Sequence, residues 1–289
     1  MFANEFEAAI VAVESMLLEV AGNPKAGNVD RDHDFEDLRY EHFIVSSVSS
    51  FPVFLDAAFN KQTAGKLVLE AVRASSKWHA ASNVHFGAFL LLIPLTMAWN
   101  SESVFELAKN ATEKVKQTDF NDSVAILKAF KLTSARVLNA EKLSLESDET
   151  ERFLVSNNIN VYEWMKLAPK ENIIAKELTN SFKISLKGGR MLLKFFEEFK
   201  DVNTAIVLCY HSLLSKYVDP LVISKVGFDL AFEIKSKAES CLREFEEKQS
   251  VEVFRKLDDE LISIGVNPGT IADLTISSIF FALAEGWRF

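Results

Sequence analysis

A run of carboxylates between two apolar segments is the first feature of the chain that could do chemistry. The stretch NPKAGNVDRDHDFEDLRYEHF (23–43) opens with turn residues and then carries acids from Asp30 to Glu41. If a helix begins near Asp34, then Asp34, Asp37 and Glu41 are spaced i, i+3 and i+7 and project from one face. Asp30 would reach the same point from the preceding loop. A cation such as Mg²⁺ would relieve the repulsion within this group, but acids near a helix N-terminus also favour the helix dipole, so a solvated acidic surface is the alternative.

A polar pair precedes the most apolar segment of the sequence. In ASNVHFG (81–87), Asn83 and His85 stand directly before FGAFLLLIPLTMAW (86–99). One interpretation places both side chains at the mouth of a buried site. The other makes Ser82 or Asn83 the cap of the following helix and leaves His85 as a loop histidine.

A glycine-containing turn near the C-terminus could hold an anion. In NPGTIADL (267–274), Gly269 lies at an expected helix start, where free N–H groups bind phosphate. Thr270 and Asp273 have nearly the spacing of a capping box, so helix capping explains the same residues without a ligand.

Two other segments are less specific. DPLVISKVG (219–227) offers Asp219 and Lys225 before a glycine, but an ordinary turn between helices explains it as well. Gly188-Gly189 lies between two basic residues and reads as a plain loop. The sequence contains no P-loop, no G-x-G-x-x-G, no G-x-S-x-G elbow, and nothing that marks a serine or cysteine nucleophile.

Composition predicts long helices and a large core. Of the 289 residues, 48% are hydrophobic and 24 are Phe, whereas there are only ten Gly and six Pro. Such a chain can bury a sizeable core and needs few turns. Neither an internal repeat nor a flexible linker interrupts it. We therefore expect an all-α, single-domain multi-helix bundle over residues 1–289.

The periodicity of apolar residues gives approximate helix positions. A helix is expected over 4–21, ended by Gly22, and a second from Asp34 to Ser50, interrupted by Pro52. Further helices are expected within 63–80, 88–99, 101–117, 122–133, 160–182, 188–218, 228–249 and from about 268 to the C-terminus.

Charge and targeting signals exclude several classes of protein. The net charge is −9 and the pI about 5.2, so no basic surface for nucleic acid is present. Cys209 and Cys241 read as buried free thiols of a reducing compartment. The N-terminal segment is acidic rather than signal-like, and 86–99 is shorter than the roughly 20 residues that span a bilayer. We expect a cytoplasmic protein without membrane contact, in which 86–99 lies in the core or at the interface of a homodimer.

Taken in order, these segments resemble one known family. NPKAGNVDRDHDFEDLRYEHFIVSS, NVHFGAFLLL, YEWMKLAPKENIIAKEL, DPLVISKVG and NPGTIADL are similar to the successive motifs of the triphosphoribosyl-dephospho-CoA synthases. The resemblance runs from about residue 5 to about residue 285 of the chain. Each match is short, and the specificity lies in the series.

The resemblance implies an all-helical transferase that uses ATP and 3′-dephospho-CoA. In that family the 2′-hydroxyl of dephospho-CoA displaces adenine at C1′ of the ATP ribose, giving a precursor of the prosthetic group of citrate or malonate lyase. Displacement at an anomeric carbon passes through an oxocarbenium-like state that carboxylates stabilise, and a base must take the hydroxyl proton. Mg²⁺ is implied as the cofactor that neutralises the triphosphate.

The matching positions define a candidate site. The catalytic candidates are Asp37, His85 and Asp273, with the general base either His85 or Asp273. Substrate and phosphate contacts are expected from Lys25, Asn28, Asn83, Lys225 and Gly269. Metal ligands are expected among Asp30, Asp34, Asp37 and Asp219.

Departures from the family motifs leave the acceptor open. Ala26 replaces a proline; Val84 and Phe86 replace a threonine and a lysine; Thr270 and Ile271 replace a glycine and a serine. This pattern resembles a divergent, archaeal-type branch. The alternatives are a related Mg²⁺-dependent nucleotide-using transferase in another cofactor pathway, which the loss of the lysine at Phe86 favours, and a non-catalytic helical nucleotide-binding protein.

Overall fold

Two apolar helices form the centre of the molecule in the computed structural model, which describes residues 1–81, 83–133 and 148–289. Every residue of α4 (Phe86–Met97) except Gly87 is buried, and so are fourteen of the sixteen residues of α15 (Gly269–Ala284). A helix that is apolar on all sides must be enclosed by others. The segment that could have served as core or as a dimer interface is therefore core, and the homodimer stays a prediction.

The remaining helices surround this centre, and the described residues contain no strand. In chain order they are α1 (Glu5–Ala21), α2 (Tyr40–Ala58), α3 (Ala64–Ser76), α5 (Val104–Lys116), α6 (Phe120–Thr133), α7 (Asp148–Ser156), α8 (Val161–Lys166), α9 (Ile173–Thr179), α10 (Lys183–Phe199), α11 (Val202–Leu214), α12 (Pro220–Val226), α13 (Phe228–Lys248), the 3-10 turn η1 (Val251–Phe254) and α14 (Arg255–Ser263). The prediction of an all-α single-domain bundle is confirmed.

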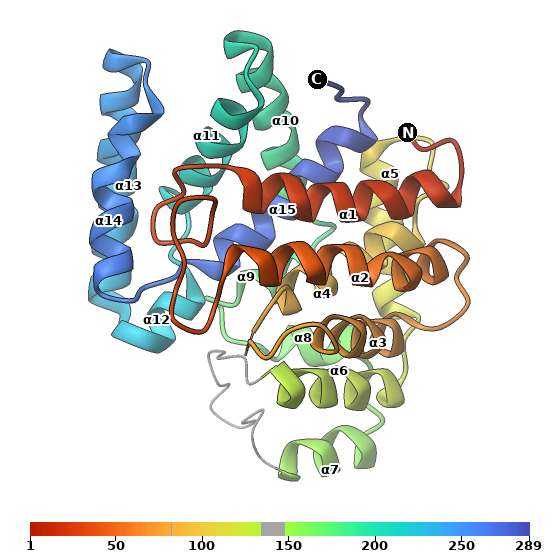
Figure 1. Ribbon diagram of the computed structural model, residues 1–289. Coiled ribbons are helices and arrows are strands. Elements are labelled where there is room, and N and C mark those ends of the chain that lie inside the picture. The colour runs from red at the N-terminus through yellow and green to blue at the C-terminus, as the bar shows by residue number, and fades with distance from the viewer. Residues whose placement is uncertain (82, 134–147) are drawn as a thin grey trace.

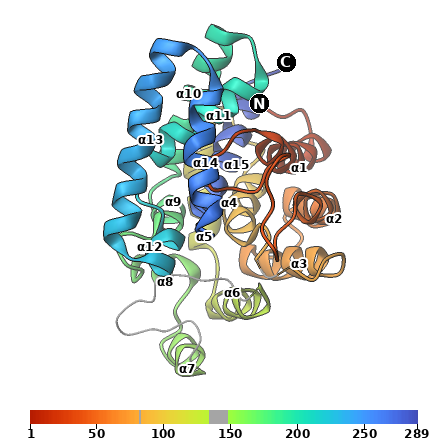
Figure 2. The same ribbon diagram turned by 60° about the vertical axis from the view of Figure 1, so that its left-hand side comes forward.

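Figure 1 shows α1, α2 and α3 as successive layers on one side of the molecule, with α15 passing behind α1. On the opposite flank α13 and α14 stand side by side, joined to the rest through α12 and α11 (Figures 1 and 2). The loop from Gly22 to Arg39 runs from α1 towards that flank before it returns to α2. This loop connects the two sides and carries the acidic stretch.

The start of α2 differs from the sequence prediction. The helix begins at Tyr40 instead of Asp34, because the Asp34 carboxylate accepts a hydrogen bond from the Tyr40 backbone N–H at 2.7 Å and residues 35–38 form a turn. Asp34, Asp37 and Glu41 therefore do not share one helical face, and that part of the prediction is wrong.

The end of α2 also differs from the sequence prediction, which placed it at Ser50. The helix continues through Pro52 to Ala58, although an internal proline removes a hydrogen bond and costs about 3 kcal/mol. Val53, Phe54 and Ala57 beyond the proline are buried, and α2 packs against both α1 and α3. Burial of this segment outweighs the local penalty.

A glycine pair allows α10 to approach the central helix. Gly188 and Gly189 lie inside α10, so the expected loop there is a helix. A Cβ on Gly188 would come within 2.1 Å of the Ser278 hydroxyl, and one on Gly189 within 2.9 Å of the Phe281 Cβ. Their function is close packing of α10 on α15. None of the described helices is long and apolar enough to span a membrane.

Candidate active site

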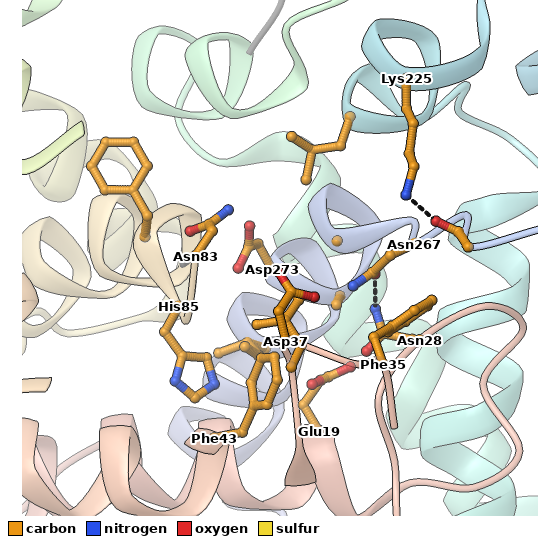
Figure 3. Close-up of a pocket in the computed structure, with 17 residues that line it drawn as sticks. Glu19, Asn28, Phe35, Asp37, Phe43, Asn83, His85, Lys225, Asn267 and Asp273 are labelled. Atoms are coloured by element: carbon orange, nitrogen blue, oxygen red, sulfur yellow. Dashed lines mark hydrogen bonds between the residues drawn. The ribbon is translucent and has the colours of Figure 1, made fainter. Parts of the chain in front are cut away.

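A pocket of about 390 Å³ opens where the acidic loop, the N-terminus of α4, α12 and the loop before α15 meet (Figure 3). Its volume lies in the range of ligand pockets, about 300–1,000 Å³. Seven of the predicted site residues line it: Asn28, Asp37, Asn83, His85, Lys225, Gly269 and Asp273. Segments separated by more than 200 residues thus contribute to one cavity.

Asp273, just beyond the first turn of α15, has a carboxyl group that is strongly affected by its surroundings. Burial, followed by the nearby charges of Glu19 and Asp219, raises its pKa well above the ordinary value, although a hydrogen bond from the Ala88 backbone N–H opposes the shift. Gly87 makes this approach possible, since a Cβ there would lie 2.0 Å from Asp273 Oδ2. The environment favours the protonated acid.

His85 faces the pocket from the N-cap position of α4. Its backbone adopts the left-handed conformation with φ 63°, which is uncommon for a residue with a side chain. Nδ1 lies 3.0 Å from the Ser46 hydroxyl, whereas Nε2 is buried and has no hydrogen-bond partner among the described residues. Burial, followed by the charges of His79 and Lys25, lowers the pKa of His85 to about 3. The ring is therefore neutral and has one unpaired nitrogen.

Three amides and one ammonium complete the polar lining. The Asn83 side-chain oxygen is buried without a hydrogen-bond partner in the described part of the chain. Asn28 Nδ2 donates to Asn267 Oδ1 at 3.0 Å, which joins the acidic loop to the turn before α15. Lys225 is exposed at the rim, and its ammonium donates to the Gly265 carbonyl (Figure 3).

The acidic loop and α2 supply part of the apolar side of the pocket. Phe35, Leu38 and Phe43 line it together with Phe86, the residue at the position of the family lysine. The Phe43 ring meets the His85 ring edge to face with centroids 5.0 Å apart. Val84, the other departure in this segment, is buried.

Lys25 lies beneath the pocket instead of lining it. Its ammonium is fully buried, 2.7 Å from Glu19 Oε1, and also donates to Asn28 Oδ1 and the Val29 carbonyl. All three N–H groups of the ammonium are thus engaged by protein oxygens. Lys25 compensates the charge of Glu19, whose carboxylate belongs to the pocket lining.

Asp30 belongs to a second buried cluster. Its carboxylate accepts hydrogen bonds from the backbone N–H groups of Lys25, Asp32 and His33 at 2.9 to 3.2 Å. Asp258 of α14 accepts from the Gly27 backbone and lies 2.7 Å from His33 Nδ1. Asp30, His33 and Asp258 are the one group of described residues whose ligand atoms are close enough to share a metal ion. These hydrogen bonds fasten the loop to α14.

The other predicted metal ligands also have structural partners. Asp219 caps α12 through the Leu221 and Val222 N–H groups and accepts from the Ile271 N–H at 2.9 Å, so it also caps α15. Burial raises the pKa of Asp219 to about 6 despite these bonds. Asp34 is exposed and holds the start of α2. The structure does not bring Asp30, Asp34, Asp37 and Asp219 together, and only Asp37 lines the pocket.

Two outcomes concern helix capping. The cap of α15 comes from Asp219, not from Thr270, which lies inside the helix. Of the two caps considered for α4, Ser82 lies outside the described residues, and the N-cap position belongs to His85. The cap of α15 does not follow from local spacing, because Asp219 comes from elsewhere in the fold.

Sequence reasoning missed Glu19 and Asn267 as pocket residues. Glu19 occupies a position in an amphipathic helix where an acid normally faces water, and only its burial reveals its role. Asn267 was visible in NPGTIADL as part of a turn, and its contact with Asn28 is what places it in the site.

Comparisons with known proteins show which family the chain resembles. The sequence model of a family described as ATP:dephospho-CoA triphosphoribosyl transferase matches residues 5–289. Among solved structures, the chain is similar to a protein from Archaeoglobus fulgidus named as a triphosphoribosyl-dephospho-CoA synthase, with 44% sequence identity and a TM-score of 0.74. The match covers 86% of this chain and 100% of that one. No curated protein matches the chain.

Proposed function

The chain belongs to the ATP:dephospho-CoA triphosphoribosyl transferase family, and on that premise we propose that the pocket between α4, α12 and α15 is its active site. The resemblance seen in the sequence motifs is confirmed, and the chain is a transferase of this family. We place it in the archaeal-type branch, which the similarity to the Archaeoglobus protein supports, and place its reaction in the cytoplasm, where ATP is available.

The reaction exchanges one bond at C1′ of the ATP ribose. The acceptor hydroxyl oxygen bonds to C1′ as the bond from C1′ to the adenine nitrogen breaks. One proton leaves the hydroxyl, and one proton is taken up by the departing adenine. The site therefore needs one group that accepts the proton of the acceptor hydroxyl and another that donates a proton to the departing adenine.

His85 is suited to be the acceptor. The observation that carries the proposal is that His85 lines the pocket while its Nε2 is buried and has no partner among the described residues. A buried nitrogen in this state leaves a hydrogen bond unmade, and a substrate hydroxyl would supply it. As the oxygen bonds to C1′ its proton becomes acidic, so a weak base suffices.

Asp273 is suited to be the donor. Its raised pKa keeps a proton on the carboxyl group at a pH where an exposed aspartate has lost it. His85 is neutral and Asp273 favours the protonated form, so the two groups differ in the way that separates a base from an acid in one site.

Substrate binding is divided between the rim and the apolar wall. Lys225 at the rim offers a positive charge to a triphosphate, and Asn28 and Asn267 offer amide groups beside it. Phe35 and Phe43 provide aromatic surface for a base or a pantetheine chain. Dephospho-CoA is the acceptor that the family implies.

The pocket also fits Mg²⁺. Its donors are carboxylate and amide oxygens without thiols, and Mg²⁺ is typically held by one or two carboxylates together with substrate phosphates. Asp37 would hold the ion, and when bound it would neutralise the triphosphate. The buried cluster of Asp30, His33 and Asp258 lies outside the pocket lining and is not needed for this.

The test is product analysis. The purified chain is incubated with ATP, dephospho-CoA and MgCl₂, free adenine is quantified, and the mass of the acceptor product is measured. We expect adenine and the triphosphoribosyl conjugate in equal amounts, both dependent on dephospho-CoA. ATP consumption that yields ADP or AMP without adenine, or no consumption at all, would contradict the proposal.

A further inference from the structure

Two buried serines differ from the other serines of their helices. Most buried serines in helices donate a hydrogen bond from the hydroxyl to a backbone carbonyl about one turn earlier. Ser47 donates to the Phe43 carbonyl at 2.7 Å, and Ser50 donates to the Ser47 carbonyl at 2.8 Å. The Ser75 hydroxyl in α3 instead donates to the Ser46 hydroxyl in α2, across the two helices, at 2.8 Å. Both residues are buried, with 0% and 2% exposure.

These two hydroxyls lie in an unbroken line between two histidines. His85 Nδ1 is 3.0 Å from the Ser46 hydroxyl. The Ser75 hydroxyl is 2.8 Å from His79 Nε2. His79 is half-buried after the end of α3, and its ring lies 5.7 Å from that of His42. The line thus begins at the pocket and ends near the surface, through four side chains from three segments.

We propose that Ser46 and Ser75 form a proton relay that connects His85 in the pocket with His79 near the surface. This inference rests on the proposed function, because it requires His85 to receive the proton of the acceptor hydroxyl. His79, Ser75 and Ser46 act through His85 and do not touch the substrate.

Each step of the relay conserves its protons. His85 Nε2 accepts the proton of the acceptor hydroxyl while Nδ1 gives its proton to the Ser46 oxygen. The Ser75 hydroxyl, which donates to Ser46 at rest, first turns toward His79. The Ser46 proton then moves to the Ser75 oxygen as the Ser75 proton moves to His79 Nε2. One proton has then left the pocket, both hydroxyls are restored, and His85 has changed only its tautomer.

This arrangement explains how so buried a histidine can act as a base. The surroundings of His85 disfavour a second proton on its ring, so a base that had to hold both protons would be weak. When one proton leaves Nδ1 as another arrives at Nε2, the imidazole stays neutral throughout. The charge forms on His79, which is less buried than His85, although burial, followed by the charge of His42, lowers the pKa of His79 as well.

The backbone holds His85 in the orientation that the relay needs. The left-handed φ of 63° is retained at a residue with a side chain, and such conformations persist where the surrounding structure imposes them. Phe43 and Phe89 enclose the ring, with centroids 5.0 and 6.1 Å from it. The ring therefore keeps Nδ1 beside Ser46 and leaves Nε2 without a partner among the described residues.

The test compares Ser46→Ala with Ser47→Ala in the adenine-release assay. The two serines are adjacent, equally buried and of equal size, and only Ser46 belongs to the relay. We expect Ser46→Ala to lower kcat by about 10-fold or more with KM changed less than about twofold, since general-base catalysis contributes about 10²–10⁴-fold. The kcat of Ser47→Ala is expected to stay within about twofold of the wild-type value, because the Ser47 hydroxyl only donates to a backbone carbonyl of its own helix.

A solvent deuterium isotope effect separates a relay from mere support. In wild type, kcat should depend nonlinearly on the deuterium fraction of the solvent, because several protons move in one step. In Ser46→Ala and Ser75→Ala this dependence should become linear. Equal kcat values for Ser46→Ala and Ser47→Ala, or an unchanged curve in folded Ser46→Ala, would overturn the relay. Absence of adenine release from wild type would instead overturn the proposed function.

A spectroscopic measurement tests, independently of turnover, whether the serine hydroxyls control which nitrogen of His85 carries the proton. Imidazole ¹⁵N shifts distinguish the two neutral tautomers of His85. We expect Ser75→Ala and Ser46→Ala to change the tautomer populations of His85 and Ser47→Ala to leave them as in wild type. Identical populations in all four proteins would show that the hydroxyl line does not govern the protons of His85.

Discussion

The acid–base cluster beneath the pocket (Lys25, Asp30, His33 and Asp258) and the pocket wall (Asn83, His85 and Asp273) contain similar residue types but differ in how their polar atoms are satisfied. In the cluster every ionisable side chain has protein partners at hydrogen-bonding or salt-bridge distance. In the wall, His85 Nε2 and the Asn83 oxygen are buried without any among the described residues. A buried polar group without a partner costs about 1–3 kcal/mol, so a protein retains it where a ligand will complete it.

Acids whose oxygens are satisfied by the protein hold the fold together, whereas acids beside unsatisfied polar atoms belong to the site. The cluster contains more acids and could hold a metal by geometry alone, yet its hydrogen bonds fasten a loop. Changes in the cluster should therefore lower the stability of the fold, and changes in the wall should lower the rate.

Lys25→Met should destabilise the protein most. It leaves the Glu19 carboxylate buried without its ammonium, and breaking a buried pair costs about 3–5 kcal/mol. The exposed pair of Lys61 and Asp56 provides the control, since Lys61→Met should cost at most about 1 kcal/mol. Urea unfolding of both variants measures the difference. Similar losses for the two would mean that the buried pair has no special part in stability.

His85→Asn should change the pH dependence of stability. Because the folded-state pKa of His85 is about 3 and the unfolded value about 6.5, the unfolded chain binds a proton first as the pH falls, and the fold loses stability below pH 6.5. Asparagine tolerates the left-handed backbone and removes this titration. The unfolding free energy of the variant relative to wild type should rise by about 2 kcal/mol between pH 7 and pH 5. Parallel stability curves for the two proteins would show that His85 is not held neutral.

Gly87→Ala should slow the reaction without unfolding the protein. The new Cβ would meet Asp273 Oδ2, the end of a side chain that can rotate away, so the acid moves while the helix remains. We expect adenine release to fall about 10-fold, as a misplaced acid loses part of its general-acid contribution. Stability should be unchanged or higher by up to about 1 kcal/mol, because alanine favours the helix. A wild-type rate would mean that the position of Asp273 does not matter.

Asp34→Ala and Asp37→Ala should separate two acids that the sequence placed together. Asp34→Ala removes the bond to the Tyr40 N–H and should cost about 1 kcal/mol of stability, as loss of a helix cap does, with an unchanged requirement for Mg²⁺. Asp37→Ala should raise the Mg²⁺ concentration needed for half-maximal adenine release. If Asp34→Ala raises it equally, the assignment of the ion to Asp37 alone fails.

The sequence predicted the fold class and most helices because apolar periodicity is a local property. The burial of α4 followed from its composition, and the series of motifs correctly pointed to Asn83, His85 and Asp273 as neighbours in one pocket. The start of α2 at Tyr40 was not predicted, because it depends on the turn over residues 35–38 and on the hydrogen bond from the Tyr40 N–H to the Asp34 carboxylate.

Long-range partners account for what the sequence did not show. Asp258 bonds to Gly27 across 231 positions, and Asp219 caps the helix that begins fifty residues later, at Gly269. Glu19 lines the pocket, and its charge is compensated there by the Lys25 ammonium at 2.7 Å. The relay serines look like any serines of amphipathic helices until α2 and α3 are packed together.

The most direct test compares Asp273→Asn with Asp258→Asn by their rates of adenine release at equal amounts of folded protein. Both carboxyl groups have a raised pKa, and asparagine keeps the shape of either side chain. Asp273 lies in the pocket wall, whereas Asp258 lies in the cluster. We expect Asp273→Asn to lose about 100-fold or more in kcat and Asp258→Asn to stay within about threefold while losing stability. A reversed result, with Asp258→Asn inactive and Asp273→Asn near wild type, would contradict the assignment of the active site.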